Sequence, residues 1–226
     1  MEKQIVDMDN KNLIKDLIDN QITMITEERF DCVLKYVDKI SKLKGDIVEC
    51  GVWRGGMSIF LSKIFPKKKI WVCDSYEGCQ NPSEGKYQFS NESHSLGMYA
   101  ASLDEVKNNF LKYDALEDDR VFFLKGWMRD ILKPEICPIE KISLLRVDVD
   151  SYSATLEVLD YLYDKVVPGG MIIFDDISGS ESATAIRDFI RRGNNLVIKH
   201  PVTHEVEDVI NSNGVHHYGC YCIKEK

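Results

Sequence analysis

The chain has 226 residues with a mass of 26.0 kDa, and 44% of its residues are hydrophobic, which is enough for one domain with a full core. Its 37 acidic and 29 basic side chains give a formal charge of -8 and a pI near 5.2, so it lacks the positive surface that nucleic acid binding requires. Seven cysteines, an odd number, indicate reduced thiols rather than a disulfide framework. Because the chain has neither a signal-peptide core nor an apolar stretch of about 18 residues, we expect a cytoplasmic protein without a membrane partner.

The first part of the chain is predicted to be helical. Apolar residues recur at helical spacing from Leu13 to Ile22 and again from Phe30 to Leu43. No repeat or Pro/Gly/Ser linker divides the chain, so we expect a single domain over residues 1–226. Within it, residues 1–45 form a helical cap and residues 46–226 form the core.

From Ile47 onward, short apolar runs alternate with helical patterns, which is typical of parallel α/β sheets. Strands are expected at Ile47–Val48, Ile70–Cys73, Val121–Leu124, Ile142–Val147, Met171–Phe174, Leu196–Lys199 and Tyr218–Ile223. Helices are expected at Met57–Phe65, Leu103–Leu111, Thr155–Tyr163 and Ala183–Arg192, and Pro168–Gly170 is expected to end the third of these. The pattern predicts a doubly wound, seven-stranded sheet whose last two strands pair antiparallel.

Acidic residues stand where four of these strands end. They are Glu49, Asp74, Asp148 with Asp150, and Asp175 with Asp176. In an open α/β sheet, ligands bind at the carboxyl ends of the strands. So many carboxylates at one edge are costly unless they meet cations or water, so we expect a binding site there.

The turn after the first strand is rich in glycine, with Gly51, Gly55 and Gly56 between strand and helix. It is not the dinucleotide-binding GxGxxG, yet glycine lets a backbone approach a ligand closely. Asp74 follows about 20 residues later, the position at which an acid binds a ribose diol in nucleotide-binding α/β folds. A simple turn or capping acid is the alternative interpretation of Asp74.

Asp148, Asp150, Asp175 and Asp176 suggest a divalent cation, most plausibly Mg²⁺. A metal there would act as a Lewis acid on a bound hydroxyl, while a neighbouring carboxylate accepts the proton. Such a site suits attack by the hydroxyl on an electrophile held over the glycine turn. S-adenosylmethionine, which carries a ribose, a carboxylate and a positive charge, is the candidate.

Five segments in order, Asp46–Phe60, Asp74–Gly78, Gly126–Trp127, Leu145–Tyr152 and Pro168–Asp176, resemble the macrocin O-methyltransferase family of antibiotic sugar methyltransferases. The resemblance implies a class I, Rossmann-like methyltransferase fold. It also implies S-adenosylmethionine and Mg²⁺ as cofactors, a sugar hydroxyl of a glycoside or nucleotide-linked sugar as acceptor, and a homodimer. Val149 stands where the family usually has glycine, and Ser178–Ser182 is unusual for it.

Site residues carried over from the resemblance fall into three groups. Asp150 corresponds to the general base, and Asp148, Asp175 and Asp176 correspond to the metal ligands. The cofactor-binding positions are Glu49, Gly51, Gly55, Ser58, Asp74, Ser75, Gly126, Trp127 and Asp148.

Three other interpretations remain. Asp148-Val149-Asp150 also matches the DxD signature of metal-dependent glycosyltransferases, although that function leaves Asp175, Asp176 and the glycine turn without a role. A non-catalytic cofactor-binding module is a second. A zinc site among His200, His204, His216, His217, Cys220 and Cys222 is a third, but the spacing is not that of a standard finger.

Overall fold

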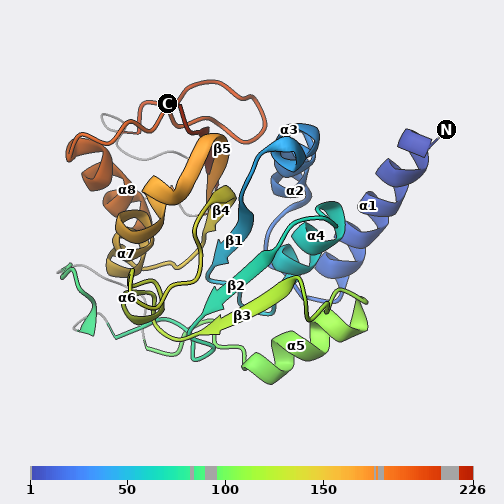
Figure 1. Ribbon diagram of the computed structural model, residues 1–226, viewed down its shortest axis with the longest axis horizontal. Helices are drawn as coiled ribbons and strands as arrows, with labels where there is room; N and C mark the ends of the chain where they lie inside the picture. The colour runs from blue at the N-terminus through green and yellow to red at the C-terminus, as the bar shows by residue number, and fades with distance from the viewer. Residues whose placement is uncertain are drawn as a thin grey trace.

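A sheet whose strands lie in the order β3-β2-β1-β4-β5-β6 forms the centre of the molecule in the computed structural model (Figure 1). The structure describes residues 2–81, 84–89, 96–175, 177, 181–209 and 219–225. The strands are β1 (Asp46–Cys50), β2 (Ile70–Asp74), β3 (Val121–Lys125), β4 (Ile142–Val147), β5 (Val166–Phe174) and β6 (Cys220–Ile223). The first five are parallel, and β6 runs antiparallel to β5.

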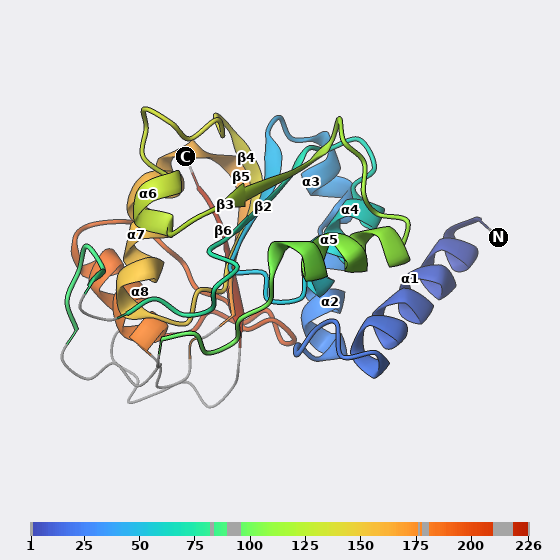
Figure 2. The same cartoon turned by 90° about the horizontal axis from the view of Figure 1, so that it is seen from below.

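Helices cover both faces of the sheet, as Figure 2 shows. One face carries α1 (Glu2–Asp19), α2 (Glu27–Leu34), α3 (Val37–Lys42), α4 (Gly56–Ile64) and α5 (Leu103–Lys112). The other carries α6 (Met128–Ile131), α7 (Tyr152–Leu162) and α8 (Glu181–Arg191), with a 3₁₀ turn at Tyr163–Lys165. Side chains alternate along each strand, so β1 buries Ile47 on the α4 face and Val48 on the α7 face. The doubly wound α/β prediction is confirmed.

Several element boundaries differ from the prediction. The segment Phe30–Leu43 is two helices, α2 and α3, rather than one, and α6 was not predicted. Pro168–Gly170 lies inside β5, where Gly169 adopts φ +82° and the pairing with β4 shifts register. Glycine tolerates this irregular backbone, which is why the strand continues through it.

Leu196–Lys199, predicted as a strand, is not one. Only Lys199 pairs, exchanging both backbone hydrogen bonds with Tyr221 of β6 at 2.7 and 3.0 Å. The described part of the chain therefore has six strands rather than seven. The bridge is antiparallel, as expected for the last two predicted strands.

The carboxyl ends of the parallel strands lie level with one another. Cys50 pairs with Cys73 on one side and with Val147 on the other, and Val147 pairs with Phe174. The ladder continues one residue past the strands, since Gly51, Asp148 and Asp175 each donate a backbone N–H to the neighbouring strand at 2.9–3.1 Å. The register thus brings residues about 25 to 100 positions apart in the sequence to one edge.

No helix within the described residues is long and apolar enough to cross a membrane. All seven cysteines are described and none forms a disulfide; six of them are buried.

Candidate active site

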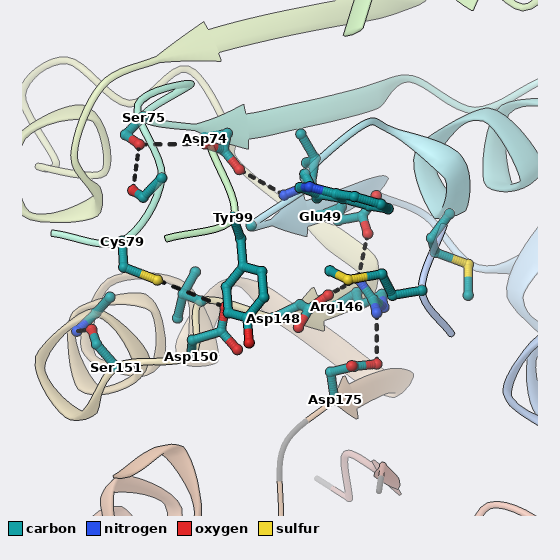
Figure 3. Close-up of a pocket in the computed structure, with 18 of the residues that line it drawn as sticks. Glu49, Asp74, Ser75, Cys79, Tyr99, Arg146, Asp148, Asp150, Ser151 and Asp175 are labelled. Carbon is teal, nitrogen blue, oxygen red and sulfur yellow. Dashed lines mark hydrogen bonds and ion pairs between the residues drawn. The ribbon is translucent and has the colours of Figure 1, made fainter. Parts of the chain in front are cut away.

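A cavity of about 440 Å³ opens at the carboxyl edge of the sheet (Figure 3). Its walls come from the turn after β1 and from the loops after β2, β3, β4 and β5. Residues 22–26, between α1 and α2, and Arg29 of α2 close it from the side of the N-terminal helices. The cavity therefore lies where the predicted glycine turn and the acids at the strand ends meet.

The glycine turn after β1 is required by close backbone packing. Gly51 adopts φ +81°, and a Cβ on it would lie 1.6 Å from the carbonyl oxygen of Asp148. Gly55, at φ +87°, caps the amino end of α4, and Gly56 lines the cavity beyond it. The turn thus presents bare backbone and a helix amino terminus to the cavity, both of which suit a polar ligand.

Gly51→Ala is expected to destabilise the fold by about 2–4 kcal/mol, because it adds an overlap with Asp148 to an unfavourable left-handed backbone. Gly193→Ala is the matched control: Gly193 has φ +96° but nothing within 4 Å of an added Cβ. It should lose only about 1 kcal/mol. Urea unfolding of both variants measures the difference, and equal losses would show that the contact with Asp148 carries no cost.

Asp74, at the end of β2, is tied to the glycine turn. Its carboxylate accepts the backbone N–H of Val52 and that of Tyr76, both at 2.7 Å. Burial raises the pKa of Asp74, and these backbone donors oppose the rise. Ser75 also donates its hydroxyl to this carboxylate, at 3.4 Å, so Asp74 organises both the glycine turn and the start of the loop after β2.

Arg146 stands at the centre of the acidic residues (Figure 3). Its guanidinium lies 2.5 Å from Glu49, 2.7 Å from Asp148 and 2.6 Å from Asp175. Glu49 is its register partner on β1, so the two side chains share the α4 face of the sheet. Behind the cavity wall, Ser58 of α4 donates a hydrogen bond to Glu49.

The second oxygen of Asp175 is bound by another arginine. Arg29 of α2 lies 2.6 Å from it, so both oxygens of this carboxylate are engaged by guanidinium groups. Burial raises the pKa of Asp175, but the two arginines outweigh burial and hold the pKa below its ordinary value. For Glu49 burial prevails over Arg146 and Ser58, and its pKa is raised. The negative charge of the acids at this edge is therefore balanced by arginine side chains, and not solely by a metal ion as the sequence suggested.

Asp150 lies past the end of β4, in the loop that leads to α7. It adopts φ +58°, outside the extended conformation of a strand. The thiol of Cys79 is 4.0 Å from its carboxylate. Ser151 then caps α7 by accepting the backbone N–H of Ala154. Both acids of the pair line the cavity (Figure 3).

The donor chemistry of the cavity suits a cation, and the charge balance agrees. Its lining includes five carboxylates, from Glu49, Asp74, Asp148, Asp150 and Asp175, and two guanidinium groups, from Arg29 and Arg146. The described residues nevertheless contain no cluster of three metal-binding side chains. Asp176, the third expected ligand, lies outside the described residues, as do His216 and His217 of the zinc interpretation.

Most of the predicted site residues meet at this cavity. Those that line it are Glu49, Gly51, Asp74, Ser75, Gly126, Trp127, Asp148, Asp150 and Asp175; Gly55 and Ser58 do not. Sequence analysis assigned no role to Arg146 or Arg29, and it missed Tyr99. Arg146 could have been found from the sequence, because it is a basic residue inside the otherwise apolar strand Ile142–Val147, two positions before Asp148.

Comparison with known proteins gives consistent matches. A family model described as Macrocin-O-methyltransferase (TylF) matches residues 1–211. Over 178 residues the chain is 33% identical to "8-demethyl-8-(2,3-dimethoxy-alpha-L-rhamnosyl)-tetracenomycin-C 4'-O-methyltransferase" of Streptomyces olivaceus, covering 74% of this chain and 67% of the relative. Over 167 residues it is 36% identical to "Demethyldecarbamoylnovobiocin O-methyltransferase" of Streptomyces niveus, covering 70% and 63%.

Among solved structures, the O-methyltransferase NovP superposes with a TM-score of 0.75 at 27% identity. The match covers 90% of this chain and 82% of that one. The chain spans roughly two thirds of the length of the two Streptomyces relatives.

Proposed function

The chain belongs to the macrocin-O-methyltransferase family, and from this we propose that it transfers a methyl group from S-adenosylmethionine to a sugar hydroxyl of a glycoside or nucleotide-linked sugar. One observation carries the proposal: the sheet register puts the glycine turn, Asp74 and the pair Asp148 and Asp150 around a single cavity. The relatives' names, which mention a rhamnosyl group and a novobiocin derivative, support a sugar-bearing acceptor. We place the reaction in the cytoplasm, which agrees with seven thiols that form no disulfide.

Binding of the cofactor is assigned to the inner wall of the cavity. Asp74 would accept the ribose hydroxyls, and the bare backbone at Gly51 would allow close approach of the methionine part. Gly126 and Trp127, after β3, would contact the adenine. S-adenosylmethionine supplies a methyl group on a positively charged sulfur, and a cavity lined by five carboxylates and two guanidinium groups favours that charge.

Asp150 is assigned as the general base. The acceptor hydroxyl would lie beside Asp150, in line with the methyl group. As oxygen forms its bond to the methyl carbon, the carbon–sulfur bond breaks, Asp150 takes the hydroxyl proton, and S-adenosylhomocysteine is left. Most of the rate enhancement would come from positioning these groups in a closed cavity.

We also propose that the enzyme uses Mg²⁺ as a second cofactor. Asp148, whose side chain is 24% exposed, lines the cavity, and Asp175 and Asp176 would complete the protein ligands. The ion would supply Lewis acidity that makes the acceptor hydroxyl easier to deprotonate. An ion at Asp175 has to replace one of its two arginine partners, so we expect Mg²⁺ to bind more weakly than a site of three unpaired carboxylates would allow.

Calorimetric titration with S-adenosylhomocysteine tests the cofactor assignment. We expect saturable binding to the wild type and at least about ten-fold weaker binding to Asp74→Asn, because the amide keeps the shape but offers only one acceptor oxygen. Asp104→Asn, an exposed acid in the first turn of α5, is the matched control and should bind as the wild type does. Repeating the titration with Mg²⁺ shows whether metal binding is coupled to the cofactor.

Two results would reject the proposal. If S-adenosylhomocysteine does not bind to the wild type, the methyltransferase assignment fails. If a nucleotide sugar with a divalent metal protects the protein against heat instead, the glycosyltransferase interpretation of Asp148-Val149-Asp150 takes its place.

A further inference from the structure

Tyr99 is an exposed aromatic residue at the mouth of the cavity. Its side chain lines the cavity, yet 43% of the residue is exposed to solvent. Figure 3 shows its ring extending from the loop after β2 towards Asp148 and Asp150. An exposed aromatic ring at a cavity mouth offers a bound ligand a large apolar face to pack against.

The backbone that carries Tyr99 is firmly held. Cys79 donates its N–H to the carbonyl of Met98 at 2.8 Å, and Gly97 donates to the carbonyl of Cys79 at 3.1 Å. Gly78 packs so closely that an added Cβ would lie 2.4 Å from the Met98 oxygen. These contacts fix residues 97–99 against the segment that follows Asp74.

Tyr99 itself adopts φ +58°, in the left-handed region that tyrosine seldom occupies. Such a conformation costs about 1–3 kcal/mol and persists only where the surroundings impose it. The hydrogen bonds of Cys79 hold Gly97 and Met98 immediately before Tyr99, whose side chain lines the cavity. The conformation therefore maintains the ring where burial alone would not place it.

Exposed apolar side chains also line the cavity. Met24, from the α1–α2 connection, is 59% exposed and Met98 is 37% exposed, and both line the cavity. Glu49, which is assigned to the cofactor, and Asp175, which is assigned to the metal, are both buried. Tyr99 is therefore more accessible to an entering molecule than these acids are.

We propose that the ring of Tyr99 is the platform on which the acceptor sugar rests while its hydroxyl faces Asp150. A pyranose ring has C–H groups on its faces and hydroxyls around its rim. An aromatic face covers the C–H groups and leaves the rim free, so one hydroxyl can point to the base while the sugar is oriented. Tyr99 is thus a positioning residue for the acceptor, and this role rests on the proposed function.

The test measures binding of p-nitrophenyl α-L-rhamnopyranoside, a simple sugar glycoside, by calorimetry at saturating S-adenosylhomocysteine. Tyr99→Ala should weaken binding of this probe by about ten-fold, whereas Tyr99→Phe and Tyr99→Trp, which keep an aromatic face, should stay within about three-fold of the wild type. Leu111→Ala, an exposed apolar residue of α5 outside the cavity lining, should have no effect. The affinity for S-adenosylhomocysteine should be equal in all five proteins.

Each remaining outcome overturns the assignment. If the probe does not bind to the wild type, or if it binds equally to Tyr99→Ala, there is no sugar platform. If Tyr99→Ala weakens S-adenosylhomocysteine instead, Tyr99 belongs to the cofactor site. If Tyr99→Phe loses as much as Tyr99→Ala, the hydroxyl and not the ring holds the sugar. Failure of S-adenosylhomocysteine to bind to the wild type would reject the methyltransferase function itself, which separates the two proposals.

Discussion

Asp150→Asn is expected to lower the rate of methyl transfer by about two to four orders of magnitude, the usual contribution of a general base. The amide has almost the same shape as the carboxylate but accepts no proton at neutral pH. The glycine turn is held by Asp74, and Arg146 is held by Glu49, Asp148 and Asp175, so the affinity for S-adenosylhomocysteine should change by less than about two-fold. The loss would therefore fall on kcat rather than on cofactor binding.

The measurement is a single-turnover assay that follows S-adenosylhomocysteine at saturating S-adenosylmethionine and acceptor. Asp104→Asn makes the same chemical change on an exposed turn of α5 and should keep the wild-type rate. A rate for Asp150→Asn within about three-fold of the wild type would show that another group takes the proton.

Arg146→Gln is expected to lower the free energy of unfolding at pH 7 by about 3–5 kcal/mol, because it leaves the buried Glu49 without its guanidinium partner and Asp175 with Arg29 alone. Arg146 is 2% exposed and contacts Glu49, Asp148 and Asp175. Glutamine can donate to one of them but compensates no charge. Urea unfolding gives the loss directly.

The loss should depend on pH in a defined direction. In the wild type, the lowered pKa of Asp175 contributes stability above the ordinary carboxyl pKa of 3.8, and this stability is lost as the pH falls. Without Arg146, burial is expected to raise the folded pKa of Glu49 still further above its unfolded value, so ionisation of Glu49 destabilises the variant more as the pH rises, while Asp175 keeps Arg29 but loses part of its lowered pKa. The difference between variant and wild type should thus shrink from pH 7 towards pH 4.

Arg120→Gln is the matched control. Arg120 is also buried, at 8% exposed, but its partners are backbone carbonyls and the half-exposed Glu117. Removing Arg120 leaves no buried carboxylate without a partner. The loss of unfolding free energy should therefore be smaller than for Arg146→Gln and nearly independent of pH between 7 and 5. Equal losses for the two arginines, with the same pH dependence, would show that the carboxylates around Arg146 are solvated and need no partner.

Local patterns in the sequence determined much of the fold. The apolar runs at Ile70–Cys73 and Ile142–Val147 became β2 and β4 because their side chains are buried on both faces of a parallel sheet. The helix predicted at Leu103–Leu111 is α5, whose cap Ser102 and buried Val106 and Phe110 follow the helical period. The prediction at Leu196–Lys199 was wrong, because a strand also needs a neighbour to pair with, and only Lys199 has one.

The candidate site followed from the same local signals, since acids and glycines at the ends of parallel strands must meet at one edge of the sheet. The pairing of charges within the site did not follow from these local signals. Arg146 lies among three carboxylates through the register of β4 with β1 and β5, and Arg29 reaches Asp175 from a helix 146 residues away in the sequence. Tyr99 reaches the cavity through hydrogen bonds between Cys79 and residues 97–98. Periodicity and turn chemistry are properties of neighbouring residues, so they can be read from the sequence. Cross-strand register, helix packing and loop pairing bring distant residues together. Only the tertiary structure therefore decided which charges are paired and which side chain lies at the cavity mouth.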